Sequence, residues 1–415
     1  MPRGKSYIPE LRLETLTRFM QQYNSPVDTT LTDMFSVSQS PSSSIKWQSQ
    51  RGGRGMTPFV PPGSPAPLTA PFGIAEHSAE AAYWKEKMYF DEEFLNNMRQ
   101  EGTEAGYLSA KARLSREMAG IKNRALRRKE WMFAKMLFAG SFEYAAEGGT
   151  KNSVDYGLPD ENQVTLATDY LWSTGTKADI LGDMINAKRV LKEGCGGKVE
   201  LAVCTSVVLE YIARDPAILT LLQKSTFGNG DLFSGNKNSI VGVNPAVLSN
   251  LLDIPTLLIY DEMYEVRSWL TGVVTLNSTV AIPVEDVTDW EVGGTMRFHN
   301  NATGTYEDCT IASIQVEAGT VTVSVAPTAS YRSGRDYVSM TRRFIPDTQF
   351  SMFCPVVEGM SVAEYMQAPF GLGRTWGLQT DTKENWDPDG IFIRVQDKGL
   401  PVLYNRDAIY SLTVA

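Results

Sequence analysis

The sequence predicts an α+β protein, and three of its patterns lead to that class. A proline-free segment from Thr103 to Ala139 carries apolar residues spaced by three and four, which is typical of one long helix. Ala178 to Tyr260 alternates helical and strand-like segments, which indicates a mixed domain. From Val273 to Met340 the apolar residues recur with period two between turn signals, which predicts a small all-β module, expected to be a barrel.

The composition describes a globular chain with an acidic balance. At 415 residues, 42% hydrophobic and 21% charged, it can bury one large core or two to three smaller ones. The net charge of −9 argues against a surface that coats nucleic acid, although a local basic surface is compatible with it. No run is long enough to span a membrane, and Met1 to Lys5 lack the apolar stretch of a signal peptide, so we expect a chain made in the cytoplasm.

Residues that could carry chemistry are scattered. The cysteines form no Cys-x-x-Cys pair, so neither a zinc site nor a disulfide framework is predicted, and we expect buried free thiols. Neither histidine lies near a partner carboxylate or cysteine in a recognisable spacing, and the acidic clusters are typical of solvated turns and helix faces. We therefore predict no catalytic residue, no cofactor and no metal. The residues considered are Cys195, Cys204, Cys309 and Cys354, His77 and His299, Asp91-Glu92-Glu93, and Glu384, Asp387 and Asp389.

A polar segment from Ser43 to Gly73 cannot bury a core of its own. It contains Arg51-Gly52-Gly53-Arg54 and, after it, Thr57-Pro58-Phe59-Val60 with further prolines. Ile45 and Trp47, then Met56 and Phe59, suit a two-stranded ribbon that lies on something else, and we expect their partners mainly on another chain. Composition alone leaves a disordered linker as an equal alternative.

The rest of the chain supplies further elements. Pro9 to Tyr23 predicts a short amphipathic helix, and Ser78 to Met98 predicts one or two helices. At the C-terminus, Ile391 to Val395 and Leu400 to Leu403 predict two strands, with a third from Ala408.

The long helix is crowded with basic residues on its remaining faces. Pairing of these residues with acids of the same or a neighbouring chain is favoured over direct contact with DNA, and charge density alone does not decide between them. The residues concerned are Lys111, Arg113, Arg116, Lys122, Arg124, Arg127, Arg128, Lys129 and Lys135.

The order of these parts resembles that of tailed-bacteriophage major capsid proteins, in particular the lambda-type coat proteins with the Hong Kong ninety-seven fold. The resemblance rests on the ribbon with Arg51-Gly52-Gly53 and Thr57-Pro58-Phe59-Val60, the long basic helix, the mixed domain, and Phe344-Ile345-Pro346-Asp347 as the strand after a central hairpin. It implies an N-terminal arm over 1–42, an extended β-ribbon loop over 43–75, a peripheral domain with the spine helix over 76–177 completed by 390–415, an axial domain over 178–268 and 343–389, and an inserted β-barrel domain over 269–342.

The resemblance implies a subunit that assembles as hexamers and pentamers into an icosahedral head around double-stranded DNA, which it contacts without sequence specificity. Separate scaffolding, portal and decoration proteins are the implied partners, with assembly in the host cytoplasm, location in the virion and no membrane contact. Candidate residues for contacts between subunits are Lys46, Trp47, Arg51, Arg54, Phe59, Arg124 and Arg128.

An alternative function belongs to a different class. A virion-associated protein that binds or hydrolyses glycans would have its site on the inserted module, where Trp290, Tyr306 and Tyr331 are the aromatic candidates. These residues fit core or edge positions of a barrel equally well, and a structural role for the module is favoured.

Overall fold

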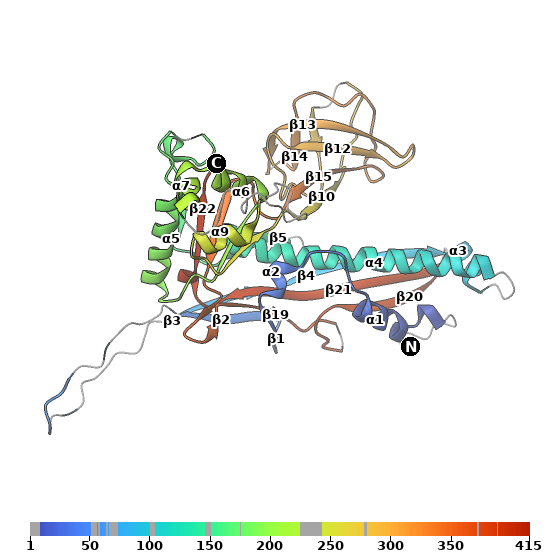
Figure 1. The fold of residues 1–415 in the computed structure, drawn as a ribbon. Coiled ribbons are helices and arrows are strands. Elements are labelled where there is room, and N and C mark those ends of the chain that lie inside the picture. Colours follow the sequence, from blue (N-terminus) through green and yellow to red (C-terminus); the bar gives the residue numbers. More distant parts are fainter. Residues whose placement is uncertain are drawn as a thin grey trace. The chain divides into compact units, whose positions relative to one another are not determined.

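The structure is a computed structural model in which two compact units are distinguished. It describes residues 9–50, 56, 59–63, 65, 74–99, 104–145, 151–174, 176–224, 243–277, 280–316, 318–371, 373–387 and 389–415. The first unit comprises Met1–Tyr260 and Asp347–Ala415, and the second comprises Asp261–Pro346. Helices and strands occur in both sequence halves, so the α+β class is confirmed (Figure 1).

One sheet of the first unit is built around a single long strand, β21. Its strands, among the described residues, are β1 (Ser36–Gln39), β19 (Ala363–Gln367), β21 (Asp389–Leu403), β20 (Gln379–Trp386) and β4 (Ala82–Asp91). We expected two strands, Ile391 to Val395 and Leu400 to Leu403, and this is wrong. The residues between them stay extended because β4 pairs with β21 without interruption from Asp91↔Gly390 to Ala82↔Gly399.

The expected helical segment from Ser78 to Met98 is also wrong for most of its length. It forms the end of β3 (Ile74–Glu80) and all of β4, and only α3 (Glu92–Arg99) is helical. Burial along β4 alternates, as it does in a strand with one covered face, and its aromatic residues stand on both faces. The aromatic content favoured a strand over a helix, and cross-strand pairing with β21 decided the outcome.

The predicted long helix is confirmed as α4 (Glu104–Ala134), which continues as a π-helix, η2 (Lys135–Ala139). Its 31 residues correspond to about 46 Å of helix. Leu114, Met118 and Ile121 pack into one buried core with Phe90 of β4 and Ile393 of β21. The helix lies alongside the long strands of the first sheet (Figure 1).

The N-terminal segment is fastened to this spine by one buried carboxylate. It contains η1 (Pro9–Leu11), α1 (Leu13–Gln22), which confirms the expected amphipathic helix, and α2 (Thr30–Asp33). Glu130 of α4 is fully buried, and its Oε1 and Oε2 accept the backbone N–H groups of Leu31 at 2.8 Å and Thr32 at 3.0 Å. The Tyr260 hydroxyl donates to Oε1 at 2.9 Å. Burial raises the pKa of Glu130 above its ordinary value.

A second sheet of the first unit is mixed in direction. Its described strands are, in order, β7 (Gln163–Thr165), β22 (Ile409–Thr413), β16 (Gln349–Phe353), β8 (Leu201–Cys204) and β9 (Thr256–Ile259), accompanied by α5 (Ile180–Gly194), α6 (Ser206–Arg214), α7 (Pro216–Lys224) and α9 (Pro245–Leu251). The expected division of the chain differs here: 390–415 is shared between both sheets, and β19 and β20, within 343–389, belong to the first sheet.

Short elements complete the first unit. A hairpin of β5 (Ser141–Ala145) and β6 (Lys151–Asp155) follows the spine helix. Gly140 ends the π-helix with a φ of 68°, and a Cβ there would lie 2.8 Å from Leu158 Cδ1. The remaining elements are η3 (Asp160–Asn162), η4 (Thr168–Tyr170), β17 (Val356–Val357), β18 (Met360–Ser361) and η5 (Arg406–Ala408).

The second unit is all β among its described residues. Its sheet is ordered β10 (Met263–Trp269), β15 (Tyr337–Arg343), β12 (Thr295–Asn300), β13 (Thr305–Gln315), β14 (Thr320–Val323) and β11 (Ala281–Pro283). An isolated bridge from Leu270 to Val284 links the two edges of this sheet. The unit begins and ends outside the expected 269–342 because β10 and β15 pair along their whole length. That this unit is an inserted barrel domain stays a prediction.

Candidate inter-subunit surfaces

The root of the predicted ribbon lies on its own chain. β2 (Ser44–Gln50) pairs with β3 in an antiparallel ladder from Ser44↔Glu80 to Gln50↔Ile74. Ile45 is fully buried and Trp47 is 5% exposed, with the Trp47 ring stacked on His77 at 5.4 Å and tilted on Tyr156 at 6.2 Å. The expectation that these two side chains find their partners on another chain is therefore wrong, and Trp47 is not accessible for a contact between subunits.

The opposite face of the ribbon root is polar and exposed. Lys46 points away from the buried face, as the alternation of β2 requires, and is paired across the ladder with Ser78. On the same face the Gln48 side chain donates to Glu76 Oε1 at 3.3 Å. Lys46 is thus accessible to a neighbouring copy, and its role in a contact stays a prediction.

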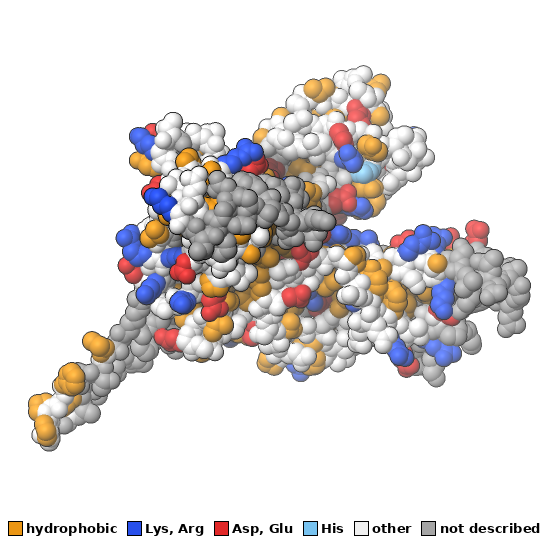
Figure 2. Space-filling view, viewed as in Figure 1, with side chains coloured by type: hydrophobic (Ala, Val, Ile, Leu, Met, Phe, Trp, Pro, Cys, Tyr) orange, Lys and Arg blue, Asp and Glu red, His pale blue; other side chains and the backbone are white. Residues whose placement is uncertain are grey.

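The described part of the ribbon tip exposes large apolar side chains. Phe59 and Met56 are fully or almost fully exposed, at 106% and 94%, and Val60 is 41% exposed. Figure 2 shows the hydrophobic side chains of this tip in orange. Arg51 and Arg54, predicted to contact a neighbour, lie outside the described residues. Among the described tip residues no acidic side chain accompanies the apolar ones.

Both candidate arginines of the spine helix have partners in their own chain. Arg124 donates two hydrogen bonds to Glu86 of β4, Nε to Oε2 at 2.9 Å and Nη2 to Oε1 at 2.6 Å, and the two side chains are about half exposed. The Arg128 guanidinium lies 5.2 Å from the centre of the Trp131 ring. The Arg124 pair is one instance of the expected pairing with acids of the same or a neighbouring chain, whereas the contact of Arg128 is with an aromatic ring. Contacts of either arginine with another subunit stay a prediction.

One basic residue of the spine helix forms a nearly buried ion pair. Lys129 Nζ lies 2.6 Å from Oδ2 of Asp397, which is fully buried on β21, and 5.0 Å from the centre of the Tyr365 ring. Nearby charge on Asp397 contributes, after burial, to holding the pKa of Tyr365 well above its ordinary value. This pair ties the helix to the long strand, and the sequence did not distinguish Lys129 from its basic neighbours.

The aromatic candidates of the inserted module do not form one surface. Trp290 and Tyr331 are 6% and 2% exposed and belong to the core of the second unit, whereas Tyr306 is 65% exposed. The Trp290 indole donates to the carbonyl of Asp286 at 3.0 Å, which satisfies its polar atom. The glycan-site alternative loses two of its three aromatic residues to the core.

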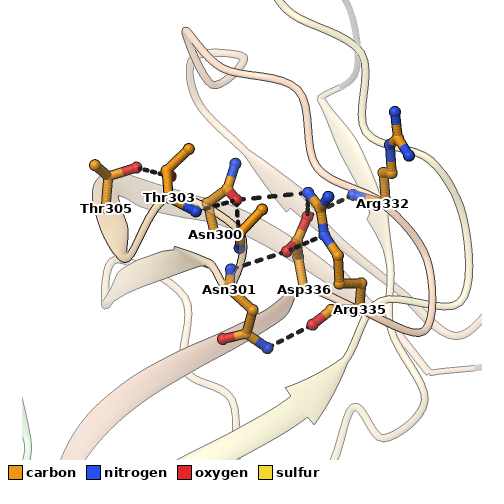
Figure 3. A network of polar contacts seen from close by, with 8 residues as sticks. Asn300, Asn301, Thr303, Thr305, Arg332, Arg335 and Asp336 are labelled. Atoms are coloured by element: carbon orange, nitrogen blue, oxygen red, sulfur yellow. Dashed lines mark hydrogen bonds and ion pairs between the residues drawn. The ribbon is translucent and has the colours of Figure 1, made fainter.

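A buried carboxylate organises one end of the second unit. Asp336 is fully buried, with Arg335, Arg332 and Asn301 around it (Figure 3). The adjacent Asn300 side-chain oxygen accepts from the Ala302 and Thr303 backbone N–H groups at 3.0 and 3.3 Å. Burial alone would raise the pKa of Asp336. The hydrogen bonds from Arg335, Arg332 and Asn301 stabilise the charged carboxylate and hold its pKa below the ordinary value. The network fastens loops to strands and leaves no carboxylate oxygen for a ligand.

Other residues considered for chemistry have structural surroundings. All four cysteines are free and buried. Asp91 accepts the Phe94 backbone N–H at 3.0 Å and so caps α3. His77 shares a hydrogen bond with Ser49 and His299 with Ser339, each at 2.8 Å. In the part of the chain that the structure describes, no group of three or more metal-ligating side chains occurs, and no helix is long and apolar enough to cross a membrane.

Comparisons with known proteins agree with this architecture. A family model described as phage major capsid protein E matches residues 12–239, more than half of the chain. No curated protein sequence matches significantly. A crystal structure of a putative prophage capsid protein from Escherichia coli CFT073 has 11% identity and a TM-score of 0.50, over 97% of this chain and 99% of that one.

Two further solved structures are similar at lower TM-scores. A phage-related protein from Bordetella bronchiseptica RB50 has 12% identity and a TM-score of 0.46, over 100% of this chain and 98% of that one. The capsid protein of Staphylococcus phage Andhra has 12% identity and a TM-score of 0.42, over 95% and 86%. The comparisons do not favour the glycan alternative. The family match shows that the chain belongs to the phage major capsid protein E family, with the tailed-phage capsid fold, and is a structural protein of the virion shell.

Proposed function

We propose that this chain builds the closed icosahedral head of a tailed phage from hexamers and pentamers, each copy laying its β2–β3 ribbon on a neighbour. The observation that carries the proposal is the exposed apolar tip with Met56 and Phe59. Covering each of these two side chains is worth about 1.5–3 kcal/mol before ordering costs. Repeated over every copy of a shell, such a contact supplies a large assembly energy from a short segment.

The proposal includes the contents and partners of the shell. Double-stranded DNA would be enclosed through non-specific contacts, which a net charge of −9 restricts to local basic surfaces. Scaffolding, portal and decoration proteins would be separate chains, with assembly in the host cytoplasm. No catalytic reaction is assigned to the chain. Lys46, Arg51 and Arg54 would flank the ribbon contact. Arg124 and Arg128 would keep their partners within the chain and contact a neighbour in addition.

Replacing Met56 and Phe59 together by Ser tests the proposal. Both side chains are exposed in the single chain, so the subunit should fold with an unchanged circular dichroism spectrum. Closed shells in electron micrographs and in sedimentation should be lost. Val325→Ser, at a residue that is 69% exposed in the second unit, is the matched control and should assemble normally. Normal shells from the double variant would overturn the proposed role of the ribbon.

A further inference from the structure

A basic pocket lies in the first unit, beside the residues that lead into the β2–β3 ribbon. It has a volume of about 660 Å³ and is formed by the segment before β2, the start of β4, β21 and the loop after β19. Its lining includes Pro41, Tyr83, Lys85, Phe370, Arg374 and Lys398. The pocket joins parts of the chain more than 300 residues apart, so it exists only in the folded subunit.

Among the described residues, three cations and no carboxylate line this pocket. The Lys85 and Lys398 ammonium groups lie 5.4 and 5.9 Å from the centre of the Tyr83 ring, which holds both at one wall. Arg374 Nη2 donates to the Pro41 carbonyl at 2.7 Å, which holds the third cation against the segment that precedes β2. None of the three forms an ion pair with any residue that the structure describes. A concave site with three uncompensated positive charges favours an anionic group.

The shape of the pocket favours a peptide over duplex DNA. A duplex is a wide cylinder that presents its phosphates on a convex surface, so it meets extended basic surfaces and does not enter a pocket of this size. Tyr83 and Phe370, whose ring centres are 5.9 Å apart, add an apolar wall that suits the carbon atoms of a peptide. An acidic turn of a protein chain fits both the charge and the wall.

The same chain carries such a turn at the opposite end of the same sheet. Trp386 of β20 pairs with Asp389 of β21, so a tight connection that contains Asp387 joins the two strands. Asp387 and Asp389 are exposed and form no ion pair with a described residue. Lys398 follows Asp389 by nine positions of extended strand, about 30 Å, so the turn cannot reach the pocket of its own copy.

We propose that the acidic turn with Asp387 and Asp389 of one copy enters the basic pocket with Lys85, Arg374 and Lys398 of a neighbouring copy. The contact joins two different surfaces, so it is head-to-tail and closes into a ring or continues around a shell. It rests on the self-association in the proposed function and is independent of the ribbon tip. A carboxylate in this pocket is attracted by three cations at once, so the contact is worth more than a single surface ion pair.

Zero-length carbodiimide cross-linking of assembled shells, followed by mass spectrometry, tests the contact directly. The reagent joins a lysine amine to a carboxylate only when the two touch. We expect linked peptides that connect Lys85 or Lys398 to Asp387 or Asp389 in shells and not in unassembled subunits. Shells in which both lysines are linked only to other carboxylates, or to none, would overturn the proposal.

Charge reversal in both partners tests whether the contact matters for assembly. Lys85→Glu with Lys398→Glu, and separately Asp387→Lys with Asp389→Lys, should each raise the concentration needed for assembly about tenfold or more. All four changes in one chain should restore assembly in part, because the exchanged charges attract each other again while Arg374 still repels the reversed turn. Lys192→Glu, at an exposed lysine of α5, is the control and should have no effect.

The outcomes separate this contact from its competitors. Pocket variants that assemble normally but retain less DNA would assign the pocket to phosphate and overturn the proposal. If the pocket variant assembled poorly, the turn variant assembled normally and the combination gave no rescue, the pocket would bind another partner. That result would also overturn the proposal. The variant with Met56 and Phe59 replaced could fail to form shells and still give the cross-link in partial assemblies. That outcome would support the contact between turn and pocket and show that it forms independently of the ribbon tip.

Discussion

Replacing Asp336 by Asn should destabilise the second unit strongly, because both oxygens of this buried carboxylate accept backbone donors. Oδ1 accepts the Asn301 N–H at 3.0 Å and Arg335 Nε at 2.9 Å. Oδ2 accepts the Arg332 N–H at 2.8 Å and Arg335 Nη2 at 2.8 Å (Figure 3). Four donors thus converge on one side chain that is fully buried.

The magnitude follows from the count of acceptors. Asparagine keeps one acceptor oxygen, and a backbone N–H cannot turn into an acceptor, so either Asn301 or Arg332 would face an amide NH₂ group. An unsatisfied buried donor costs about 1–3 kcal/mol, and weakening the charged hydrogen bonds of Arg335 costs about 1 kcal/mol more. We expect a loss of about 3 kcal/mol in the free energy of unfolding of this unit.

Asp308→Asn is the matched control in the same unit. Asp308 also accepts two hydrogen bonds from one arginine, Arg297, at 2.7 and 2.8 Å. Both side chains are exposed, however, at 39% and 45%, so water replaces the lost partner. The same substitution should therefore cost less than about 1 kcal/mol here.

Hydrogen exchange of the full chain measures the difference. A loss of 3 kcal/mol corresponds to about a hundredfold faster exchange of the slowest amides in β12 and β15, if exchange occurs through unfolding of the unit. Asp308→Asn should accelerate the same amides less than about fivefold. Equal exchange rates in the two variants would refute the argument that burial of its hydrogen-bond donors makes the loss of Asp336 costlier than the loss of Asp308.

Acidification should act on the original chain in the same direction. The pKa of Asp336 is lower in the folded unit than in the unfolded chain. Its contribution is therefore fully present above the unfolded-state pKa, about 3.9, and is lost as the pH falls through the folded-state pKa. The stability of the second unit should decline below about pH 4. This decline should be shallower in Asp336→Asn, and identical slopes would contradict the assignment.

Two further substitutions test the spine helix. Glu130→Gln leaves one of two backbone N–H groups, that of buried Leu31 or that of half-buried Thr32, without an acceptor. Exchange in residues 28–33 should therefore rise about tenfold or more, whereas Glu117→Gln on the exposed side of α4 should leave it unchanged. Ile121→Asp would bury an unpaired carboxylate at a fully buried position and should abolish soluble expression, and a soluble, folded variant would show that the apolar stripe is not core.

Elements with one dominant pattern could be predicted from the sequence, and mixed patterns could not. The spine helix followed from spacing alone because one face of α4 is apolar over many turns. β4 was predicted as a helix although its aromatic content favours a strand, because its pairing partner, β21, lies 300 residues away in the chain. Long-range pairing of this kind leaves no mark in the local sequence.

Sites were predictable only where one segment contains them. The ribbon was predicted because a single segment contains it. The packing of Trp47 on Tyr156 could not be predicted, because Tyr156 belongs to a later part of the chain. The basic pocket draws its three cations from three segments, and each of them alone looks like an ordinary surface residue. Proximity produced by folding, and not residue type, separates Lys85 and Lys398 from the other lysines.

The long strand explains how one chain can present two complementary surfaces at a fixed separation. Asp389 begins β21 and Lys398 lies about two thirds of the way along it, and the residues between them are all paired with β4. Ile391, Ile393 and Val395 bury this strand in the core beneath α4, so the separation of about 30 Å cannot vary without disrupting that core. In a head-to-tail contact, such a strand acts as a rigid spacer between successive contacts. Curvature of a shell would then have to come from rotation at the contact, which a pocket that holds carboxylates by charge permits more readily than an interlocked apolar surface.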